Sequence, residues 1–323
     1  MFDFIQEIDD VDLPGAIKKA CEITHIEYTN TPMYSEDEIK CIKKLRNRNI
    51  KYTNELLSDD EALDYLYDRG LDEDDIKKWR LGLVPDNRDN RPNNYLAGRL
   101  AFPIMFGKDE NSYCIGMAYR TLDEASECKY VYDCVDKTPS FKGRNAYLYG
   151  LNYAKAAAKK SGSIIIVEGY MDAISMHKTG YINTVASMGT ELAATQIDLL
   201  KGAVNKVYLF WDGDKPGVDA VPKAIISLIK NGFEVFVIPL LADKDPADLC
   251  LEFEFDKKKM ARYIKKNCFI GLRDIIDKKL SLFENMVLSL QTDIFKEINE
   301  IILNIPDAAT REIYLSFVRK RLL

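Results

Sequence analysis

The sequence predicts a chain of mixed α+β and α/β architecture, with an N-terminal mixed α/β subdomain, a central parallel βαβ sheet and a C-terminal helical bundle. From about residue 161, short apolar strands alternate with helical stretches, which is typical of right-handed crossovers and of a sheet buried on both faces. Between 99 and 132, short β-like pieces separated by polar turns indicate a curled antiparallel sheet. Beyond about 257, apolar residues recur with the helical period, so we expect only helices there.

These patterns divide the chain into four expected segments. In chain order they are an N-terminal helical segment, a mixed basic α/β subdomain, the central sheet domain and the helical bundle: 1–58, 59–160, 161–256 and 257–323. In the first segment, Ser35 and Glu38 have the spacing of a capping box and predict the start of a helix. Residues 88–94 are expected to form a loop. The strands of the central sheet are expected at 163–169, 182–187, 206–214 and 234–240.

Composition excludes several classes of protein. Apolar residues make up 47% of the 323 residues and charged residues 30%, which is an ordinary globular balance and argues against wholesale disorder. The apolar runs at 164–167 and 207–211 are far shorter than the ~18 residues needed to span a bilayer, and the acidic start does not resemble a leader peptide. We therefore expect a soluble protein of the cytoplasm. The net charge of −6 argues against non-specific coating of nucleic acid.

Cysteine and histidine usage indicates which metal the chain can hold. The seven cysteines include no CxxC pair, and their wide spacing suits reduced thiols rather than a zinc site. With only His25 and His177 available, a site of three histidines is impossible. We expect no zinc in this chain, and oxygen ligands favour Mg²⁺ or Mn²⁺.

Acidic side chains follow three strands of the central sheet, at the edge where open α/β sheets bind ligands. They are Glu168 and Asp172 after the first strand, Asp212 and Asp214 after the third, and Asp245 and Asp248 after the fourth. A single such acid is usually a turn residue or a helix cap, but three clusters at one edge repel one another unless a divalent cation holds them. If the third strand continues to residue 214, alternation sends Asp212 and Asp214 to the same side. Asp172 either joins the cluster or is a first-turn acid favoured by the helix dipole.

A basic stretch lies near the N-terminus. Residues 40–51, KCIKKLRNRNIK, hold six lysines and arginines in twelve positions of a predicted helix. This pattern suits either a solvated helix face or a strip that follows phosphate groups. The sequence alone favours neither interpretation.

The order of motifs resembles a known family. VEGYMD at 167–172, followed by DGDxxG and then DPxD, resembles the Toprim domain. The wider context resembles the RNA-polymerase core of bacterial DnaG-type primases, and this likeness covers about five-sixths of the chain. The further matching stretches are YLYDRGL, LGLVPDN, GRLAFPI, YCIGMAYR, KYVYD, FKGRNAYLYGL, VASMGTELAATQ and TREIYLSFVRKRLL.

The resemblance implies an activity and a set of site residues. It implies a DNA primase core that uses NTPs to make short RNA primers on single-stranded DNA by two-metal nucleotidyl transfer. The implied metal site comprises Glu168, Asp172, Asp212, Asp214, Asp245 and Asp248, with Glu168, Asp212 and Asp214 in the catalytic role. The implied nucleotide- and template-binding residues are Arg99, Arg120, Lys129 and Lys142. From the residues alone, each of these basic side chains is equally an ordinary surface charge.

The sequence departs from the family pattern in two places. The family's GGR is Ala118-Tyr119-Arg120 here, and its PKYLNSP is replaced by residues 128–134, which bears on the nucleotide contacts. The family's N-terminal zinc ribbon and C-terminal helicase-binding domain have no counterpart in the sequence. We therefore expect either an excised core or a compact primase such as a bacteriophage encodes, and we favour the second. A replicative helicase and a separate zinc-binding module are the expected partners, in a bacterial cell or a phage-infected host.

Two other functions use the same residues. A Toprim nuclease would use the acids to activate water, but a nuclease has no need of the nucleotide-holding motifs around GRLAFPI and FKGRNAYLYGL. A non-catalytic adaptor for single-stranded DNA would not need the full acidic set. Among single residues, His177 is expected to be a surface or packing residue rather than a ligand, and Trp211 to lie in the core. Tyr147 and Tyr149 either pack on strands or stack on a base.

Overall fold

The computed structural model describes residues 19–23, 35–86, 95–107, 112–123, 126, 128–137, 141–189, 191–213, 215–240, 244–281 and 287–322. The chain divides into two compact units, Met1–Lys40 and Cys41–Leu323. Much of the expected N-terminal helical segment, at 1–18 and 24–34, lies outside the described residues, and so does the predicted loop at 88–94.

The first long helix is α3 (Glu36–Leu56), and it begins where the sequence predicts. The N–H of Ser35 donates to Glu38 Oε2 at 3.1 Å, and the N–H of Glu38 donates to Ser35 Oγ at 3.2 Å, so the capping box is present. Residues 41–56 of this helix belong to the larger unit. Two short helices follow, α4 (Asp60–Asp68) and α5 (Glu73–Trp79), each with an aspartate as its N-cap.

The first sheet of the larger unit is antiparallel, as expected from the short β-like pieces. Its strands run in the order β1-β2-β3-β4, so each strand pairs with the strand next to it in the sequence. They are β1 (Gly82–Leu83), β2 (Leu100–Phe106), β3 (Tyr113–Arg120) and β4 (Tyr130–Lys137). Arg120 pairs with Tyr130, so the end of β3 lies beside the start of β4.

The second sheet has the order β6-β5-β7-β8-β9, and its first four strands are parallel as predicted. The strands are β5 (Ser163–Val167), β6 (Thr184–Ala186), β7 (Lys206–Leu209), β8 (Glu234–Val237) and β9 (Phe269–Ile270). The expectation of only helices beyond 257 is wrong at β9, which pairs antiparallel with β8. Pairing with a sheet edge depends on a distant strand, and helical periodicity in the local sequence does not report it.

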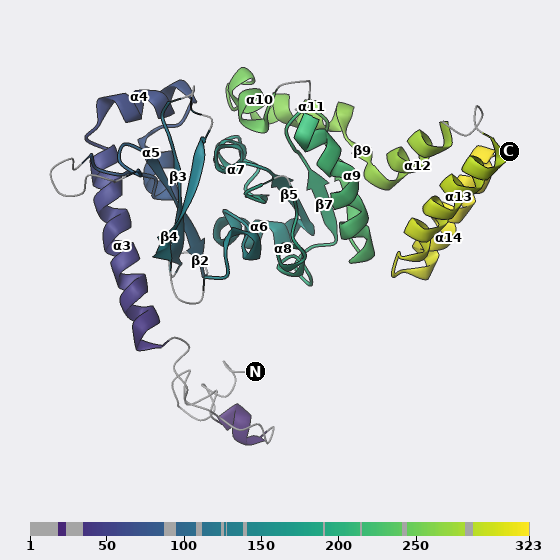
Figure 1. Ribbon diagram of the computed structural model, residues 1–323, viewed down its shortest axis with the longest axis horizontal. Helices are drawn as coiled ribbons and strands as arrows, with labels where there is room; N and C mark the ends of the chain where they lie inside the picture. The colour runs from purple at the N-terminus through teal and green to yellow at the C-terminus, as the bar shows by residue number, and fades with distance from the viewer. Residues whose placement is uncertain are drawn as a thin grey trace. The chain divides into compact units, whose positions relative to one another are not determined.

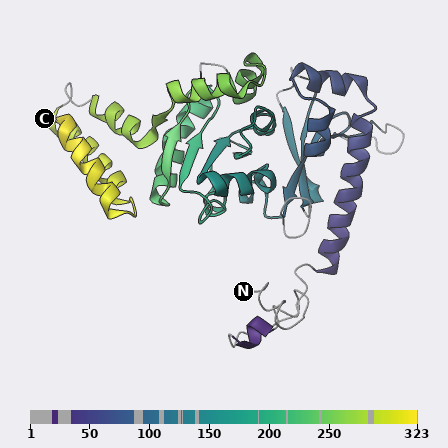
Figure 2. The same ribbon diagram turned by 180° about the vertical axis from the view of Figure 1, so that it is seen from behind.

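Helices cover both faces of this sheet. Successive side chains of β5 point to opposite faces, so they pack in two different core clusters. Ile165 and Val167 pack in a cluster with the antiparallel sheet, while Ile164 and Ile166 pack in a second cluster with the C-terminal helices. Figure 1 and Figure 2 show the strands with their surrounding helices from opposite sides. The helices between the strands are α6 (Leu151–Ser161), α7 (Tyr170–Lys178), α8 (Ala194–Asp198), α9 (Lys215–Lys230), α10 (Pro246–Glu252) and α11 (Lys257–Asn267).

The chain ends in helices, as predicted. After α12 (Gly271–Ser281), α13 (Leu288–Leu303) and α14 (Ala308–Leu322) lie side by side (Figure 1). Leu272 of α12, Ile298 of α13 and Val318 of α14 are buried in the same core cluster. In the described part of the chain, no helix is both long and apolar enough to cross a membrane.

Candidate active site

The carboxyl ends of β5 and β7 bring two acids together. Glu168 directly follows β5 and is only 8% exposed. Its Oε1 accepts the backbone N–H of Asp212 at 3.3 Å, so the chain leaving β7 is joined to the chain leaving β5. These strands are hydrogen-bonded neighbours in a parallel sheet, which is why their acidic ends meet.

Asp172 lies beneath this edge, in the first turn of α7. Its Oδ2 accepts the N–H of Gly169 at 2.9 Å, and its Oδ1 accepts the N–H of Ala247 in α10 at 3.1 Å. Burial raises the pKa of Asp172 well above its ordinary value, and the charges of Asp245 and Asp212 raise the pKa further. Asp172 therefore joins the acidic cluster, and it also fixes the start of α7 against α10.

Asp245 is the N-cap of α10. Its Oδ1 accepts the N–H of Asp248 at 2.7 Å, and Asp248 Oδ2 accepts the N–H of Asp245 at 3.3 Å, which completes a capping box. Burial raises the pKa of Asp245, and so does the Asp248 carboxylate, whereas the charge of Arg120 lowers it. Asp248 itself is exposed.

The structure describes part of the predicted acidic set. Asp214 lies outside the described residues. The strand β7 ends at Leu209, so the condition under which strand alternation would align Asp212 with Asp214 is not met. Among the described residues, no three His, Cys, Asp or Glu side chains are close enough together to hold a metal ion. The complete metal site therefore stays a prediction.

Arg120 is the predicted basic residue that the structure brings to the acids. It ends β3, and its Nη1 donates to the hydroxyl of Tyr130 at 3.1 Å. Its guanidinium also lies 5.4 Å from the Tyr130 ring centroid. Burial raises the pKa of Tyr130 to about 12, and the charge of Arg120 opposes that rise. The ring centroids of Tyr130 and Tyr170 of α7 lie 5.4 Å apart. Because Arg120 is bonded to Tyr130, this aromatic packing fixes Arg120 relative to the acidic edge.

The other predicted basic residues lie further out. Arg99 Nη1 donates to the carbonyls of Cys128 and Lys129, each at 3.4 Å, and so supports the backbone that leads into β4. Lys129 is exposed one residue before Tyr130, the partner of Arg120 in the sheet. Lys142 is exposed on the loop before the short 3₁₀ turn Arg144–Ala146. Among the described residues, no hydrogen bond or ion pair joins Arg99 or Lys142 to Glu168, Asp172, Asp212, Asp245 or Asp248.

Sequence reasoning missed Arg144. Its Nη1 donates to the carbonyl of Met188 at 2.8 Å, and the N–H of Met188 donates to the carbonyl of Glu168 at 3.0 Å. Met188 has a φ of 64°, an uncommon left-handed conformation for a side chain with a Cβ. Arg144 therefore holds the strained backbone of Met188, which is in turn hydrogen-bonded to the backbone of Glu168. The available signal was its place in the FKGRN motif, two residues after Lys142.

The expectations for single aromatic and histidine residues are confirmed. His177 is buried, its Nε2 lies 2.8 Å from the carbonyl of Thr184, and burial lowers its pKa to about 4. Tyr149 is buried and stacks on Trp79 with ring centroids 5.3 Å apart. Tyr147 stacks on Phe141 at 5.2 Å, and Trp211 is buried in the core. The fold itself therefore accounts for these side chains.

Comparison with known proteins adds independent information. The Toprim-like family model matches residues 165–250, which include Glu168, Asp172, Asp212 and Asp245. The DNA primase of Campylobacter jejuni is 30% identical over 315 residues, covering 88% of this chain and 48% of that protein. The chain spans about half the length of the curated relatives it matches.

Solved structures share the fold. The zinc-binding and RNA polymerase domains of the Aquifex aeolicus primase align with a TM-score of 0.71 at 25% identity, covering 99% of this chain and 81% of that chain. A DnaG primase catalytic domain bound to ssDNA aligns with a TM-score of 0.73 at 21% identity, covering 88% of this chain and 100% of that chain. The similarity therefore extends well beyond the Toprim-like segment, into the antiparallel sheet that carries Arg120.

Proposed function

Because this chain belongs to the DnaG-type primase family and contains a Toprim-like domain, we propose that it is a primase core that makes short RNA primers on single-stranded DNA. The observation that supports the proposal is electrostatic: the charges of Asp245 and Asp212 act on the buried Asp172, and the charge of Arg120 acts on Asp245. Phosphoryl transfer requires acidic side chains that hold cations and a nearby cationic side chain that attracts phosphate.

The acidic cluster fits Mg²⁺ or Mn²⁺ as cofactor, and zinc is not expected. Every side-chain donor is an oxygen, and burial together with the carboxylates of Asp245 and Asp212 raises the pKa of Asp172. When bound, such ions lower the pKa of an attacking 3′-hydroxyl and neutralise the leaving pyrophosphate. In this proposal Glu168 and Asp212 hold one ion, and Asp214, Asp245 and Asp248 hold the other. Asp172 supports them from beneath.

The basic residues would position the substrates. Arg120 is close enough to Asp245 to lower its pKa, so it is placed to bind an NTP phosphate that approaches the same acids. Lys129, exposed beside the partner strand of Arg120, and Lys142 would attract the phosphates of the template. Arg99 would hold the backbone that presents Lys129.

The partners follow from the same family. Single-stranded DNA is the proposed template, in line with the ssDNA bound to one solved relative of the same fold. A replicative helicase and a separate zinc-binding module are proposed to act with the chain, in the cytoplasm of a bacterial cell or a phage-infected host. The zinc-binding domain that accompanies the Aquifex aeolicus relative supports the second partner.

A priming assay tests the proposal. The protein is incubated with single-stranded DNA, NTPs and Mg²⁺ or Mn²⁺, and the products are resolved for short RNA and for cut DNA. We expect short RNA from the wild type, and a loss of at least ~100-fold in Glu168→Gln and Asp212→Asn, since each removes a metal ligand. The matched control is Asp198→Asn, which removes an exposed carboxylate that forms an ion pair with Lys201, in the turn after α8. Cut DNA without RNA would instead favour the Toprim nuclease.

A further inference from the structure

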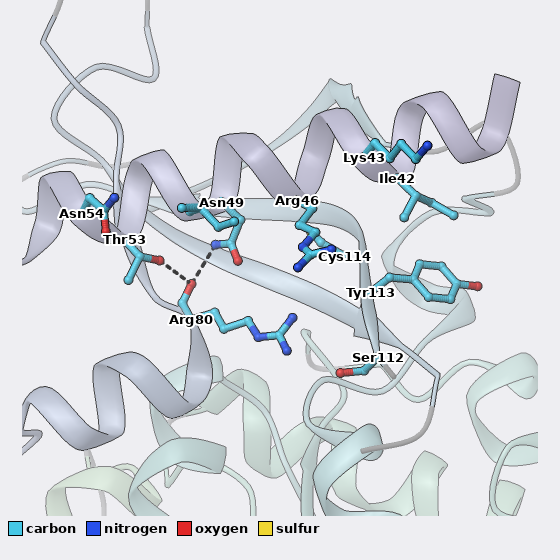
Figure 3. A pocket seen from close by; sticks show the side chains of 11 residues that line it. Ile42, Lys43, Arg46, Asn49, Thr53, Asn54, Arg80, Ser112, Tyr113 and Cys114 are labelled. Atoms are coloured by element: carbon cyan, nitrogen blue, oxygen red, sulfur yellow. Dashed lines mark hydrogen bonds between the residues drawn. The ribbon is translucent and has the colours of Figure 1, made fainter. Parts of the chain in front are cut away.

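A second candidate site lies away from the acids, between α3 and the start of β3. It is a pocket of about 640 Å³, lined by α3 from Ile42 to Asn54, by Arg80 and by Ser112–Cys114. Figure 3 shows the side chains of Arg46, Arg80 and Ser112 around this space. A volume of this size accommodates one small organic ligand. Two residues of the basic stretch at 40–51, Lys43 and Arg46, therefore line a pocket and do not merely cover a solvated face.

The pocket is strongly cationic. Lys43, Arg46 and Arg80 line it, and among the residues that the structure describes no acidic side chain does. Within the described ranges, none of these three side chains forms an ion pair or a hydrogen bond through its charged group. Three unpaired cations around one cavity repel one another, and an anionic ligand would relieve that repulsion.

The backbone of Arg80 is held in an unfavourable conformation. Arg80 is the C-cap of α5 with φ 54° and ψ 37°, the left-handed region in which glycine is favoured at helix ends. A side chain with a Cβ is strained there. The carbonyl of Arg80 accepts hydrogen bonds from Asn49 Nδ2 at 2.8 Å and Thr53 Oγ1 at 3.4 Å (Figure 3). These bonds from α3 fix the residue so that its guanidinium lines the pocket, at a position where glycine would suit the fold better.

Ser112 is the second unusual feature. It is 7% exposed, and its Oγ has no hydrogen-bond partner among the described residues. A buried hydroxyl without a hydrogen-bond partner destabilises the fold, so such groups normally have one. Because Ser112 lines the pocket, a ligand bound there would be in reach of this hydroxyl.

We propose that this pocket binds a free nucleotide, with its phosphates on Arg46, Arg80 and Lys43 and a polar atom on the Ser112 hydroxyl. The apolar side chains that share the lining, Ile42 and Tyr113, supply a surface for the base. A pocket of about 640 Å³ suits one nucleotide better than a continuous strand.

The site is separate from the acids. Ser112 precedes β3 and Arg120 ends it, and an extended strand of this length places the two about 25 Å apart. A nucleotide bound in this pocket is therefore not the nucleotide that reacts. Its binding would make occupancy of the pocket depend on the concentration of free nucleotide. This inference does not depend on the proposed function, since binding is measured without catalysis.

Calorimetry of ATP binding in EDTA tests the proposal on the full chain. Without divalent ions, the carboxylates of the acidic cluster repel ATP, which leaves the pocket as the expected site. We expect binding to weaken at least ~10-fold in Arg80→Gly and in Ser112→Ala, since each removes a ligand contact. It should be unchanged in Lys44→Ala, which removes an exposed charge of the same helix outside the pocket, and in Asp212→Asn.

Thermal melting without nucleotide separates binding from a structural role. Glycine relieves the left-handed strain at position 80, and alanine removes the unsatisfied hydroxyl at 112, so both variants should melt at the wild-type temperature or above it. Three results would overturn the proposal: no ATP binding in EDTA, binding that depends on Asp212 rather than on Arg80, or binding of a deoxythymidine oligonucleotide without binding of ATP. A lower melting temperature for Arg80→Gly would also overturn it, since the guanidinium would then serve the fold.

Discussion

Asp172 shows how one side chain serves both the fold and the candidate site. Both of its oxygens accept backbone N–H groups, one from the turn before α7 and one from α10. Such bonds favour the charged carboxylate, yet burial and the neighbouring acids raise its pKa well above the ordinary value. In the protein alone, burial and the neighbouring acids therefore disfavour the charged Asp172 carboxylate more than its hydrogen bonds favour it. A bound cation would stabilise the charged form.

This conflict predicts a pH dependence of stability. The folded-state pKa values of Asp172 and Asp245 lie above the unfolded value near 3.8, so both carboxyls bind protons more tightly in the folded protein. Their contribution to stability is present at low pH and is lost as pH rises through the folded pKa. In EDTA we expect the melting temperature to fall as the pH rises above the ordinary aspartate value of 3.8, and Asp172→Asn to flatten that fall. An unchanged slope in Asp172→Asn, with Asp198→Asn as the reference, would contradict this account.

At the scale of elements, the turn between β5 and α7 determines where Glu168 and Asp172 lie. Gly169 separates them and has an ordinary φ of −99°, so conformational freedom is not what requires glycine here. A Cβ at this position would lie 2.7 Å from Asp172 Oδ2. Glycine is required because the Asp172 carboxylate approaches the backbone closely.

Gly169→Ala should therefore disrupt the turn through Asp172. We expect a loss of about 1–2 kcal/mol in the free energy of unfolding, because the added methyl displaces the carboxylate from the Gly169 N–H. Combining it with Asp172→Ala removes the clashing atoms, so the two losses should be less than additive in chemical denaturation. Strict additivity would show that the methyl acts elsewhere.

The elements also show where sequence reasoning succeeds. Apolar runs with helical stretches between them suffice to predict the parallel strands, because burial on both faces leaves that pattern. The pattern does not reveal β9, whose two residues are a strand only because β8 offers an edge. It also places the end of β7 too late, since Phe210 and Trp211 are buried beyond the strand as they would be within it.

The candidate site was predictable to a similar degree. Acids at strand ends are readable because the edge of a parallel sheet gathers them. The approach of Arg120 to Asp245 depends on packing between Tyr130 and Tyr170, which are far apart in the sequence. Arg144 acts through a carbonyl of a distant loop, and no local pattern indicates such a contact.

At the scale of the whole molecule, the chain combines the acidic candidate site with a net charge of −6. That charge offers little general attraction for DNA, so binding to a template depends on the few basic residues near the edge. A primase must hold its template before any duplex product contributes affinity. A protein that binds both the template and this core would raise the effective concentration of one near the other.

We therefore expect priming by this chain alone to be slow and to increase when partners are added. Addition of the replicative helicase, or of a zinc-binding protein, from the same genome should raise the rate by at least ~10-fold through effective concentration. The assay compares initial rates with each addition and with a heat-denatured control. Full-strength priming by the isolated chain, unchanged by either addition, would show that it holds the template itself.

The central claim is that the acidic edge directs template-copying RNA synthesis. The measurement that tests it most directly is the identity of the ribonucleotides incorporated on DNA templates of different sequence, in the presence of Mg²⁺ or Mn²⁺. The account predicts short RNA complementary to each template, and none from Asp212→Asn, which loses a proposed metal ligand. RNA whose composition ignores the template, or complementary RNA made equally well by Asp212→Asn, would contradict it.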